Sequence, residues 1–285
     1  MLAHVSKVLH WSAVDGPGNR LVLFLQGCNF ACAGCHNPHT IRLCNDCGDC
    51  VPACPHAALS LVGGRIAFDP ALCDECDLCL RACLISASPM TRQMSVDDVL
   101  DLLRASRGFL TGITISGGEA TMQAKFVEAL FAAMAADADL AGLSRFIDSN
   151  GHLGPRGWQR LLPLTDGAML DIKAFDPATH QRLTGMSNAK SLASARLLQE
   201  AGKLYELRYL MVPGFTDTEP EIEALAAFAR ELGPGLRLKL NAFQHHGVQG
   251  AARDWPKMPR QGVEAAAARL RAAGIDNVVI PSVWI

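Results

Sequence analysis

Three cysteines in the stretch Cys28-Asn29-Phe30-Ala31-Cys32-Ala33-Gly34-Cys35 constrain this chain more than any other feature. Their spacing is C-x3-C-x2-C, and they follow the apolar run 21–25 directly, which predicts a loop at the end of a strand. An iron–sulfur cube normally takes four cysteines, so three thiolates would leave one iron open for another ligand. In zinc proteins an open position distinguishes catalytic from structural sites, and we extend that logic to this loop. A zinc knuckle is the alternative interpretation.

The composition describes a globular protein. The chain has 285 residues, 49% of them hydrophobic, which is enough for one large domain and a small insertion. The net charge is −2 and no basic run stands out, which favours a protein or small-molecule partner over a nucleic acid. Residues 1–10 have no apolar core of signal-peptide length, and no run reaches the length of a membrane span. We therefore expect a cytoplasmic protein that binds neither nucleic acid nor membrane. We also expect a monomer.

Eleven cysteines are an odd number for a disulfide framework, and their C-x2-C and C-x3-C steps indicate metal in a reducing compartment. Residues 41–89, which we call the cysteine segment, hold two runs that each match the bacterial ferredoxin pattern. In that pattern three thiols of a run hold one cube and the fourth crosses to the other. The predicted ligand sets are Cys44, Cys47, Cys50 with Cys83, and Cys73, Cys76, Cys79 with Cys54. Two zinc sites are the alternative, although zinc does not require four cysteines per run.

From Ser95 onward the pattern alternates between helix and strand. Ser95 and Asp98 form a predicted helix cap, and apolar residues at four-residue steps predict a further helix over Phe126, Leu130 and Met134. Such alternation predicts a parallel sheet with helices outside. About six strand–helix units precede the last strand, fewer than the eight of a full barrel. The predicted fold class is α/β, with residues 1–40 and 90–285 forming one domain around the cysteine segment.

Two polar motifs follow predicted strands, at the ends where the working residues of parallel barrels lie. Gly117-Gly118-Glu119 closes a strand, and its glycines allow a close approach of the main chain, although Gly-Gly is also a common turn. Asp148 begins an Asp-Ser-Asn-Gly sequence that is also typical of a turn.

Three charged residues follow or lie in later strands. Asp171 and Lys173 are two positions apart, so on an extended strand both side chains face the same side. A surface ion pair is the alternative interpretation of these two. Arg208 lies in an apolar strand, where an unpaired guanidinium would be costly to bury, so we expect a polar or anionic partner for it.

The three-cysteine loop is the signature of radical S-adenosylmethionine (SAM) enzymes. The segment Asp15-Gly16-Pro17-Gly18 before the loop and Cys35-His36-Asn37-Pro38 at its end resemble the activating enzymes of glycyl radical enzymes, over nearly the whole chain. This resemblance implies a partial (β/α)6 TIM-like barrel with an inserted ferredoxin-like domain that holds two [4Fe-4S] clusters. It implies that SAM binds the open iron of a third cluster, held by Cys28, Cys32 and Cys35. The 5′-deoxyadenosyl radical from SAM then takes a hydrogen atom from a glycine of a partner protein.

The resemblance also implies roles for single residues. Gly117, Gly118 and Glu119 would meet the amino group of SAM, and Lys173, beside Asp171, its carboxylate. Asp148 would face SAM and help to hold a monovalent cation, and Arg208 would reach SAM. Gln244 stands where the family often has histidine and keeps hydrogen-bonding capacity without charge, whereas His245 and His246 fit solvent-facing loop positions. Gly34 departs from the family, which usually has an aromatic residue there against the adenine. The chain looks most similar to the YjjW-type subgroup.

Three functions compete at this stage. The first is an activase of a glycyl radical enzyme that takes electrons from a flavodoxin or ferredoxin-type donor. The second is a radical SAM enzyme that attacks a small molecule, and the third is a ferredoxin-type electron carrier, which would leave most of the chain without a role. The clusters of the cysteine segment either stabilise that segment or relay electrons, and we hypothesise a relay.

Overall fold

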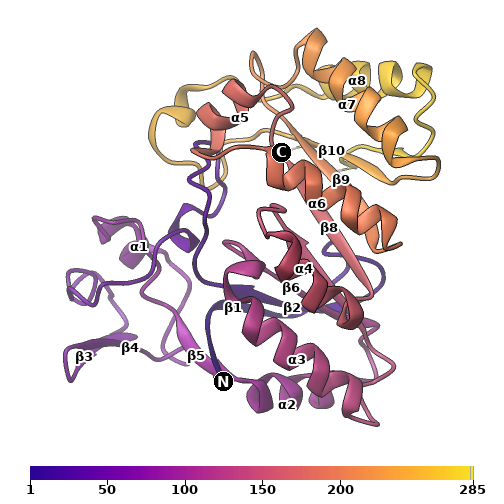
Figure 1. Cartoon of the computed structure of the whole chain (residues 1–285). Helices are drawn as coiled ribbons and strands as arrows, with labels where there is room; N and C mark the ends of the chain where they lie inside the picture. Colours follow the sequence, from indigo (N-terminus) through magenta and orange to yellow (C-terminus); the bar gives the residue numbers. More distant parts are fainter. Residues whose placement is uncertain (283, 285) are drawn as a thin grey trace. The chain divides into compact units, whose positions relative to one another are not determined.

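The computed structural model describes residues 1–282 and 284. The chain divides into two compact units, and Figure 1 follows their elements along the sequence. Unit 1 comprises Met1–Asn29 and Asn37–Leu143, and unit 2 comprises Phe30–His36 and the chain from Ser144 on. The cysteine segment belongs to unit 1, so the predicted division at residues 41 and 89 stays a prediction.

Unit 1 contains a sheet in the strand order β6-β2-β1-β5. Its strands are β1 (Leu2–Ser12), β2 (Arg20–Leu25), β5 (Arg92–Ser95) and β6 (Gly112–Gly117). β2 and β6 are parallel, whereas β1 is antiparallel to both β2 and β5. The parallel strands were predicted, but the sequence prediction contained no strand at β1. Few β1 side chains are fully buried, among them Ala3 and Val5, so its apolar alternation is weak.

The helices of unit 1 are the 3₁₀ helices η1 (Pro38–Thr40) and η2 (Ala120–Gln123) and the α-helices α1 (Leu78–Ala82), α2 (Val96–Ser106) and α3 (Ala124–Ala136). Two of these helices, α2 and α3, were predicted from the sequence, and the shorter ones were not. The cap of α2 is confirmed: the Ser95 hydroxyl accepts from the Asp98 N–H at 3.1 Å, and the Asp98 carboxylate accepts from the Ser95 N–H at 2.7 Å. Phe126, Leu130 and Met134 of α3 are buried, as predicted.

The cysteine segment has little regular structure. It contains α1 and an antiparallel hairpin of β3 (Leu59–Val62) and β4 (Arg65–Phe68). In the described chain, the residues other than glycine with positive φ all lie in this segment; they are Asp46, Ala57, Glu75, Asp77 and Ser86. Left-handed backbone is uncommon outside glycine, so the segment is shaped by constraints other than helix and strand propensity.

Unit 2 contains a parallel sheet in the order β11-β10-β9-β8-β7. Its strands are β7 (Ser144–Ser149), β8 (Gly167–Ile172), β9 (Leu204–Met211), β10 (Leu238–Ala242) and β11 (Val278–Val279). Its helices are α4 (Pro155–Leu161), η3 (Leu162–Leu164), α5 (Pro177–Thr184), α6 (Ala189–Glu200), α7 (Glu219–Leu232), η4 (Gly250–Asp254) and α8 (Arg260–Ala272). The alternation of strand and helix is confirmed, and α7 is capped at its end by Gly233, whose φ is 104°.

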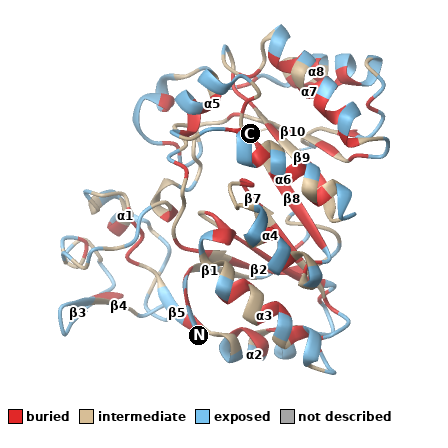
Figure 2. Cartoon of the chain, viewed as in Figure 1, coloured by how far each residue is buried: buried red, intermediate tan, exposed pale blue. Residues whose placement is uncertain are grey.

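One face of the unit 2 sheet is apolar and buried, and Figure 2 shows β8 mostly in red, the colour of buried residues. Leu207, Tyr209, Leu238 and Leu240 are fully buried, and α6 and α8 pack on the strands that carry them. The alternate residues of β8, β9 and β10 include charged side chains, some of them half-buried and others, such as Glu206, buried. This polar face holds several of the charged residues singled out from the sequence. In the described residues no helix has the length and apolar character needed to cross a membrane.

Candidate functional site

The three-cysteine loop follows β2, as predicted, and hydrogen bonds hold its main chain at several points. In unit 1 the Cys28 N–H donates to the carbonyl of Ile41 at 3.0 Å. In unit 2 the N–H groups of Ala31 and Ala33 donate to the carbonyls of Thr184 and Leu183, both at 2.9 Å. These two acceptors end α5, where carbonyls lack intrahelical partners. Local hydrogen bonding thus fixes the part of the loop that carries Cys32.

The thiols of the loop must lose their protons to bind a cluster. Cys28, Cys32 and Cys35 are partly buried. Burial raises the pKa of the Cys32 thiol to about 11, and the nearby Lys173 ammonium offsets this only in part. Cluster ligands are thiolates, so iron must replace the proton of Cys32. The donor set fits a three-cysteine [4Fe-4S] cluster with one open iron.

Gly34 lies where a larger residue would displace a neighbouring side chain. A Cβ atom at Gly34 would approach the Phe243 ring carbon Cε2 to 2.9 Å, and Trp255 lies behind it at 3.9 Å. The Trp255 and Phe215 ring centroids are 4.6 Å apart. Aromatic rings from later in unit 2 therefore occupy the space that an aromatic side chain at position 34 would need.

The Gly117-Gly118-Glu119 motif lies where the main chain of β6 comes close to that of β2 in unit 1. A Cβ atom at Gly117 would lie 2.1 Å from the Leu25 carbonyl oxygen, and one at Gly118 would lie 2.5 Å from the Gly27 oxygen. The Glu119 N–H donates to the Gly27 carbonyl at 2.8 Å, and its buried carboxylate accepts from the Thr121 N–H at 2.9 Å. Packing alone therefore requires both glycines, and the predicted contact with SAM stays a prediction.

Asp171 and Lys173 form an ion pair, so the prediction that both side chains face one side is confirmed. The Lys173 ammonium donates to the Asp171 carboxylate at 2.7 Å, and both side chains are less than one-third exposed. Burial by itself would raise the pKa of Asp171, but the positive charges of Lys173 and Arg208 outweigh burial and lower it. Burial would likewise lower the pKa of Lys173, but the Asp171 charge outweighs burial and raises it. Both groups therefore stay charged.

Arg208 has the anionic partners that its apolar surroundings predicted. Its guanidinium donates to Asp148 at 3.2 Å and to Glu206 at 2.7 Å, and Glu206 also accepts from Arg237 at 2.7 Å. Burial would raise the pKa of Glu206, but its bonds to Arg208 and Arg237 lower it. Sequence reasoning missed Glu206, although its two-residue spacing from Arg208 was the signal used for Asp171 and Lys173.

Gln244 offers a buried acceptor to a ligand. Its amide nitrogen donates to the Met258 carbonyl at 3.3 Å, while its Oε1 is buried without a hydrogen-bond partner in the described residues. His36 bonds to the main chain of Gln244, and its Nε2 is buried and equally unpartnered. The His245 ring lies 2.6 Å from the Trp255 carbonyl, so its polar bond is internal, whereas His246 is exposed as predicted. Unpartnered buried acceptors are rare and fit a site for a hydrogen-bond donor.

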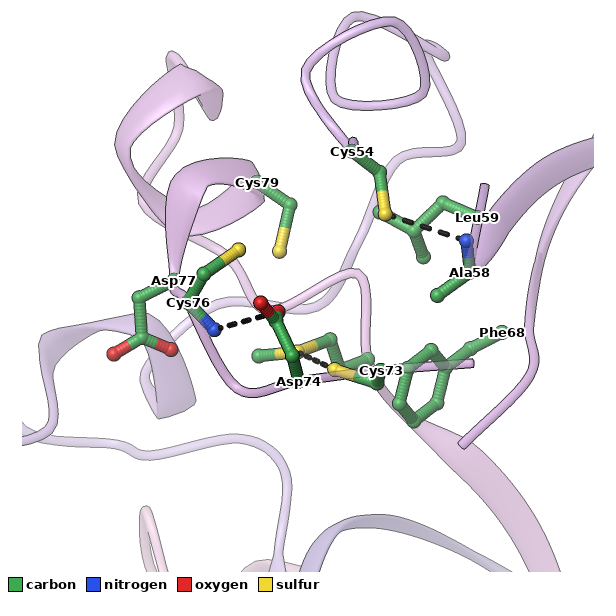
Figure 3. A pocket seen from close by; sticks show the side chains of 10 residues that line it. Cys54, Ala58, Leu59, Phe68, Cys73, Asp74, Cys76, Asp77 and Cys79 are labelled. Carbon is green, nitrogen blue, oxygen red and sulfur yellow. Dashed lines mark hydrogen bonds between the residues drawn. The ribbon is translucent and has the colours of Figure 1, made fainter. Parts of the chain in front are cut away.

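In the cysteine segment, thiols from the two runs lie close together, and the predicted ligand sets stay predictions. Cys54, Cys73, Cys76 and Cys79 line one pocket, and Figure 3 shows their sulfur atoms turned toward one another. Burial raises the pKa of Cys50 to about 11, and the neighbouring thiols that raise it further are Cys44, Cys83 and Cys47. In the described part of the chain, no three or more His, Cys, Asp or Glu residues are arranged to hold a single metal ion.

The two cysteine runs repeat one backbone conformation. Positive φ occurs at Asp46, Gly48 and Ala57 and again at the corresponding residues Glu75, Asp77 and Ser86. The N–H of Asp46 donates to the Cys44 sulfur and that of Glu75 to the Cys73 sulfur, both at 3.4 Å. The N–H of Ala58 donates to the Cys54 sulfur and that of Ala87 to the Cys83 sulfur, both at 3.3 Å. Main-chain bonds to ligand sulfurs tune iron–sulfur clusters, so this repeat fits two similar cluster sites.

Residues 22–229 match the sequence pattern of the Radical SAM superfamily. The chain belongs to this family. It is 31% identical to the indoleacetate decarboxylase activating enzyme of Tractidigestivibacter scatoligenes, over 80% of this chain and 79% of the relative. It is 32% identical to the isethionate sulfite-lyase activating enzyme of Nitratidesulfovibrio vulgaris, over 81% of each chain. It is 28% identical to pyruvate formate-lyase 1-activating enzyme of Escherichia coli, over 82% of this chain and 78% of the relative. The predicted resemblance to activating enzymes of glycyl radical enzymes is confirmed.

Solved structures agree on the fold. QueE from Escherichia coli matches with a TM-score of 0.56 at 14% identity, over 99% of this chain and 94% of that chain. A radical SAM methyltransferase from Sphaerobacter thermophilus matches with a TM-score of 0.57 at 15% identity, over 98% and 76%. The chain has the radical SAM α/β fold with a partial barrel-like parallel sheet.

Proposed function

We propose that this protein cleaves SAM reductively and takes a hydrogen atom from a glycine of a partner glycyl radical enzyme. The observation that carries the proposal is the sequence relation to activating enzymes over about four-fifths of both chains. The C-x3-C-x2-C loop, held by main-chain bonds on both sides of Cys32, supplies a matching donor set. The YjjW-type assignment, a monomeric state and a cytoplasmic location are further parts of this proposal.

We propose a ligand set for each cofactor. Cys28, Cys32 and Cys35 hold the cluster whose open iron binds SAM and which supplies the electron for its cleavage. Two further [4Fe-4S] clusters take the sets Cys44, Cys47, Cys50, Cys83 and Cys54, Cys73, Cys76, Cys79. The residues proposed for SAM are Gly117, Gly118 and Glu119 in unit 1, and Asp148, Asp171, Lys173, Arg208 and Gln244 in unit 2.

The charged residues of unit 2 hold one another in place through ion pairs. Asp171 holds Lys173, and Asp148 with Glu206 holds Arg208, so their side chains need little reordering when SAM enters. Gln244 Oε1 is free to accept from a hydroxyl or amino group of SAM. A monovalent cation beside Asp148 stays a prediction, and Arg208 already supplies that carboxylate with a positive charge.

The clusters of the cysteine segment are proposed to relay electrons from a flavodoxin or ferredoxin-type donor. Cys47→Ala or Cys76→Ala should then slow turnover with a protein donor and leave dithionite-driven SAM cleavage intact. Loss of activity with both donors, while the barrel stays folded and SAM still binds, would assign these clusters to stability or partner docking instead.

One experiment separates the competing functions. The anaerobically reconstituted protein is mixed with SAM, dithionite and a candidate glycyl radical enzyme. A glycine-centred radical in the electron paramagnetic resonance spectrum supports the proposal, whereas 5′-deoxyadenosine without that radical favours a small-molecule substrate. Absence of SAM cleavage would return the chain to the class of electron carriers.

A further inference from the structure

One row of charged residues crosses three neighbouring strands of unit 2. Asp171 of β8 is the register partner of Arg208 of β9, and Arg208 is the register partner of Lys239 of β10. Register partners on adjacent strands present their side chains on one face of a sheet. All three residues are half-buried, while Tyr209 and Leu240 next to them are buried on the other face. Lys239 therefore shares the polar face with the residues proposed for SAM.

The ion pairs on this face leave one cation over. Lys173 is paired with Asp171, Arg208 with Asp148 and Glu206, and Arg237 with Glu206.

Lys239 makes no hydrogen bond or ion pair with any residue that the structure describes. The polar face of unit 2 thus carries three carboxylates, those of Asp148, Asp171 and Glu206, and four cationic side chains. The Lys239 charge still lies close enough to Asp171 and Glu206 to lower the pKa of both carboxyl groups.

The Lys239 side chain is partly buried, and its ammonium has no directly bonded anion among the described residues. Partial burial removes hydration from a charge, and a bonded anion would replace that hydration. Asp171 and Glu206 are already bonded to other cations, so neither is available to Lys239 without breaking an existing pair. A carboxylate arriving with a ligand would satisfy the ammonium and neutralise the excess charge of the face.

We propose that Lys239 binds a carboxylate of the ligand that enters the polar face of unit 2. The inference rests on the proposed function and deepens it, since nothing in the sequence motifs singled out this lysine. A carboxylate can come from the methionine part of SAM or from an acidic side chain beside the glycine of the partner protein. The chemistry recognised is the same in both cases, and binding measurements separate the sources.

Binding of SAM to reconstituted Lys239→Ala, measured by anaerobic calorimetry, tests the first source. Loss of a charge-assisted bond should weaken SAM binding about ten- to a hundredfold. The analogue of SAM without its carboxylate should bind the wild type and Lys239→Ala equally. Lys239→Arg keeps the charge and should bind SAM more tightly than Lys239→Ala. Lys257→Ala removes an exposed lysine and serves as the matched control, with iron content measured for every variant.

Two synthetic peptides test the second source. They share one sequence around a central glycine, but one has glutamate beside the glycine and the other has glutamine. If SAM binding is unchanged but only Lys239→Ala loses the preference for the glutamate peptide, the carboxylate belongs to the partner. If Lys239→Ala matches the wild type with SAM and both peptides, the inference is overturned. A wild-type protein that binds no SAM would overturn the proposed function as well, so the two failures are distinguishable.

Discussion

The cysteine segment and the parallel sheet of unit 2 fill their interiors with different groups. In the segment the buried residues of the core are Cys50, Leu59 and Cys79, while large apolar side chains such as Leu61 and Leu84 are exposed. In unit 2, Leu207 and other apolar side chains of the strands are fully buried under helices. Thiols thus occupy interior positions in the cysteine segment, whereas aliphatic side chains occupy them in the sheet of unit 2. We therefore expect the segment to depend on metal for its core, whereas the sheet depends on apolar burial.

The largest expected difference between the regions concerns SAM cleavage. Cys32→Ala removes a proposed ligand of the SAM-binding cluster and should abolish formation of 5′-deoxyadenosine. Cys47→Ala should keep dithionite-driven cleavage, although each variant should lose about four irons. Chromatography of the nucleoside products and iron analysis check both outcomes. Cleavage of SAM by Cys32→Ala would contradict the ligand assignment.

Removal of iron should unfold one region and spare the other. Without metal the cysteine segment has too small an apolar core to stay folded, so its amides should exchange at rates near those of an unfolded chain. Amides of β8 and β9 provide the internal control and should keep their protection. Hydrogen exchange read by mass spectrometry compares the holo and iron-free proteins. Equal protection of residues 41–89 in both would show that the segment does not depend on metal.

Overpacking at Gly34 should show how closely unit 2 is packed. Gly34→Tyr forces a ring into the space of Phe243 and should cost about 1–3 kcal/mol of unfolding free energy. Phe243→Ala leaves a cavity and should cost about 3–5 kcal/mol. If the two sites share this space, the double variant should lose less than the two single losses combined. Denaturant unfolding of the four proteins measures the coupling, and strict additivity would place the residues apart.

The smallest expected effect is a loss of the stability of unit 2 at acid pH. The pKa values of Asp171 and Glu206 lie below the ordinary range, so the stability from their ion pairs is complete above about pH 4. This stability is lost as the pH falls through the folded-state values. Asp171→Asn should therefore unfold at a midpoint that falls less steeply below about pH 4 than that of the wild type. Thermal unfolding across this range provides the measurement, and parallel slopes would refute the role of Asp171.

Local sequence patterns predicted much of the fold. The elements that they did not predict depend on contacts between distant parts of the chain. Ser95 with Asp98 and the buried residues of α3 follow from spacing within one helix, so the sequence was sufficient for them. The sequence did not predict the antiparallel strand β1, because few of its side chains are buried and its pairing with β2 stabilises it.

The site divides in the same way. Spacing of two predicted the Asp171–Lys173 pair, and ferredoxin-type spacing predicted the cysteines that line one pocket. The meeting of Gly34 with Phe243 depends on how distant parts of the chain pack, and no local pattern carries that information. The same holds for Lys239, whose significance lies in the pairing of its neighbours.

The crossed ligand sets of the cysteine segment have a consequence for how the protein is made. Under the proposed assignment Cys54 serves the set of the second run, and Cys83 serves the set of the first. During synthesis from the amino end, the first set therefore waits for the last cysteine of the segment, and the second set is complete only when Cys79 has emerged. Neither half can be loaded by itself, so a truncated product would carry thiols but no finished site. Cluster delivery must act on the finished segment as a single substrate.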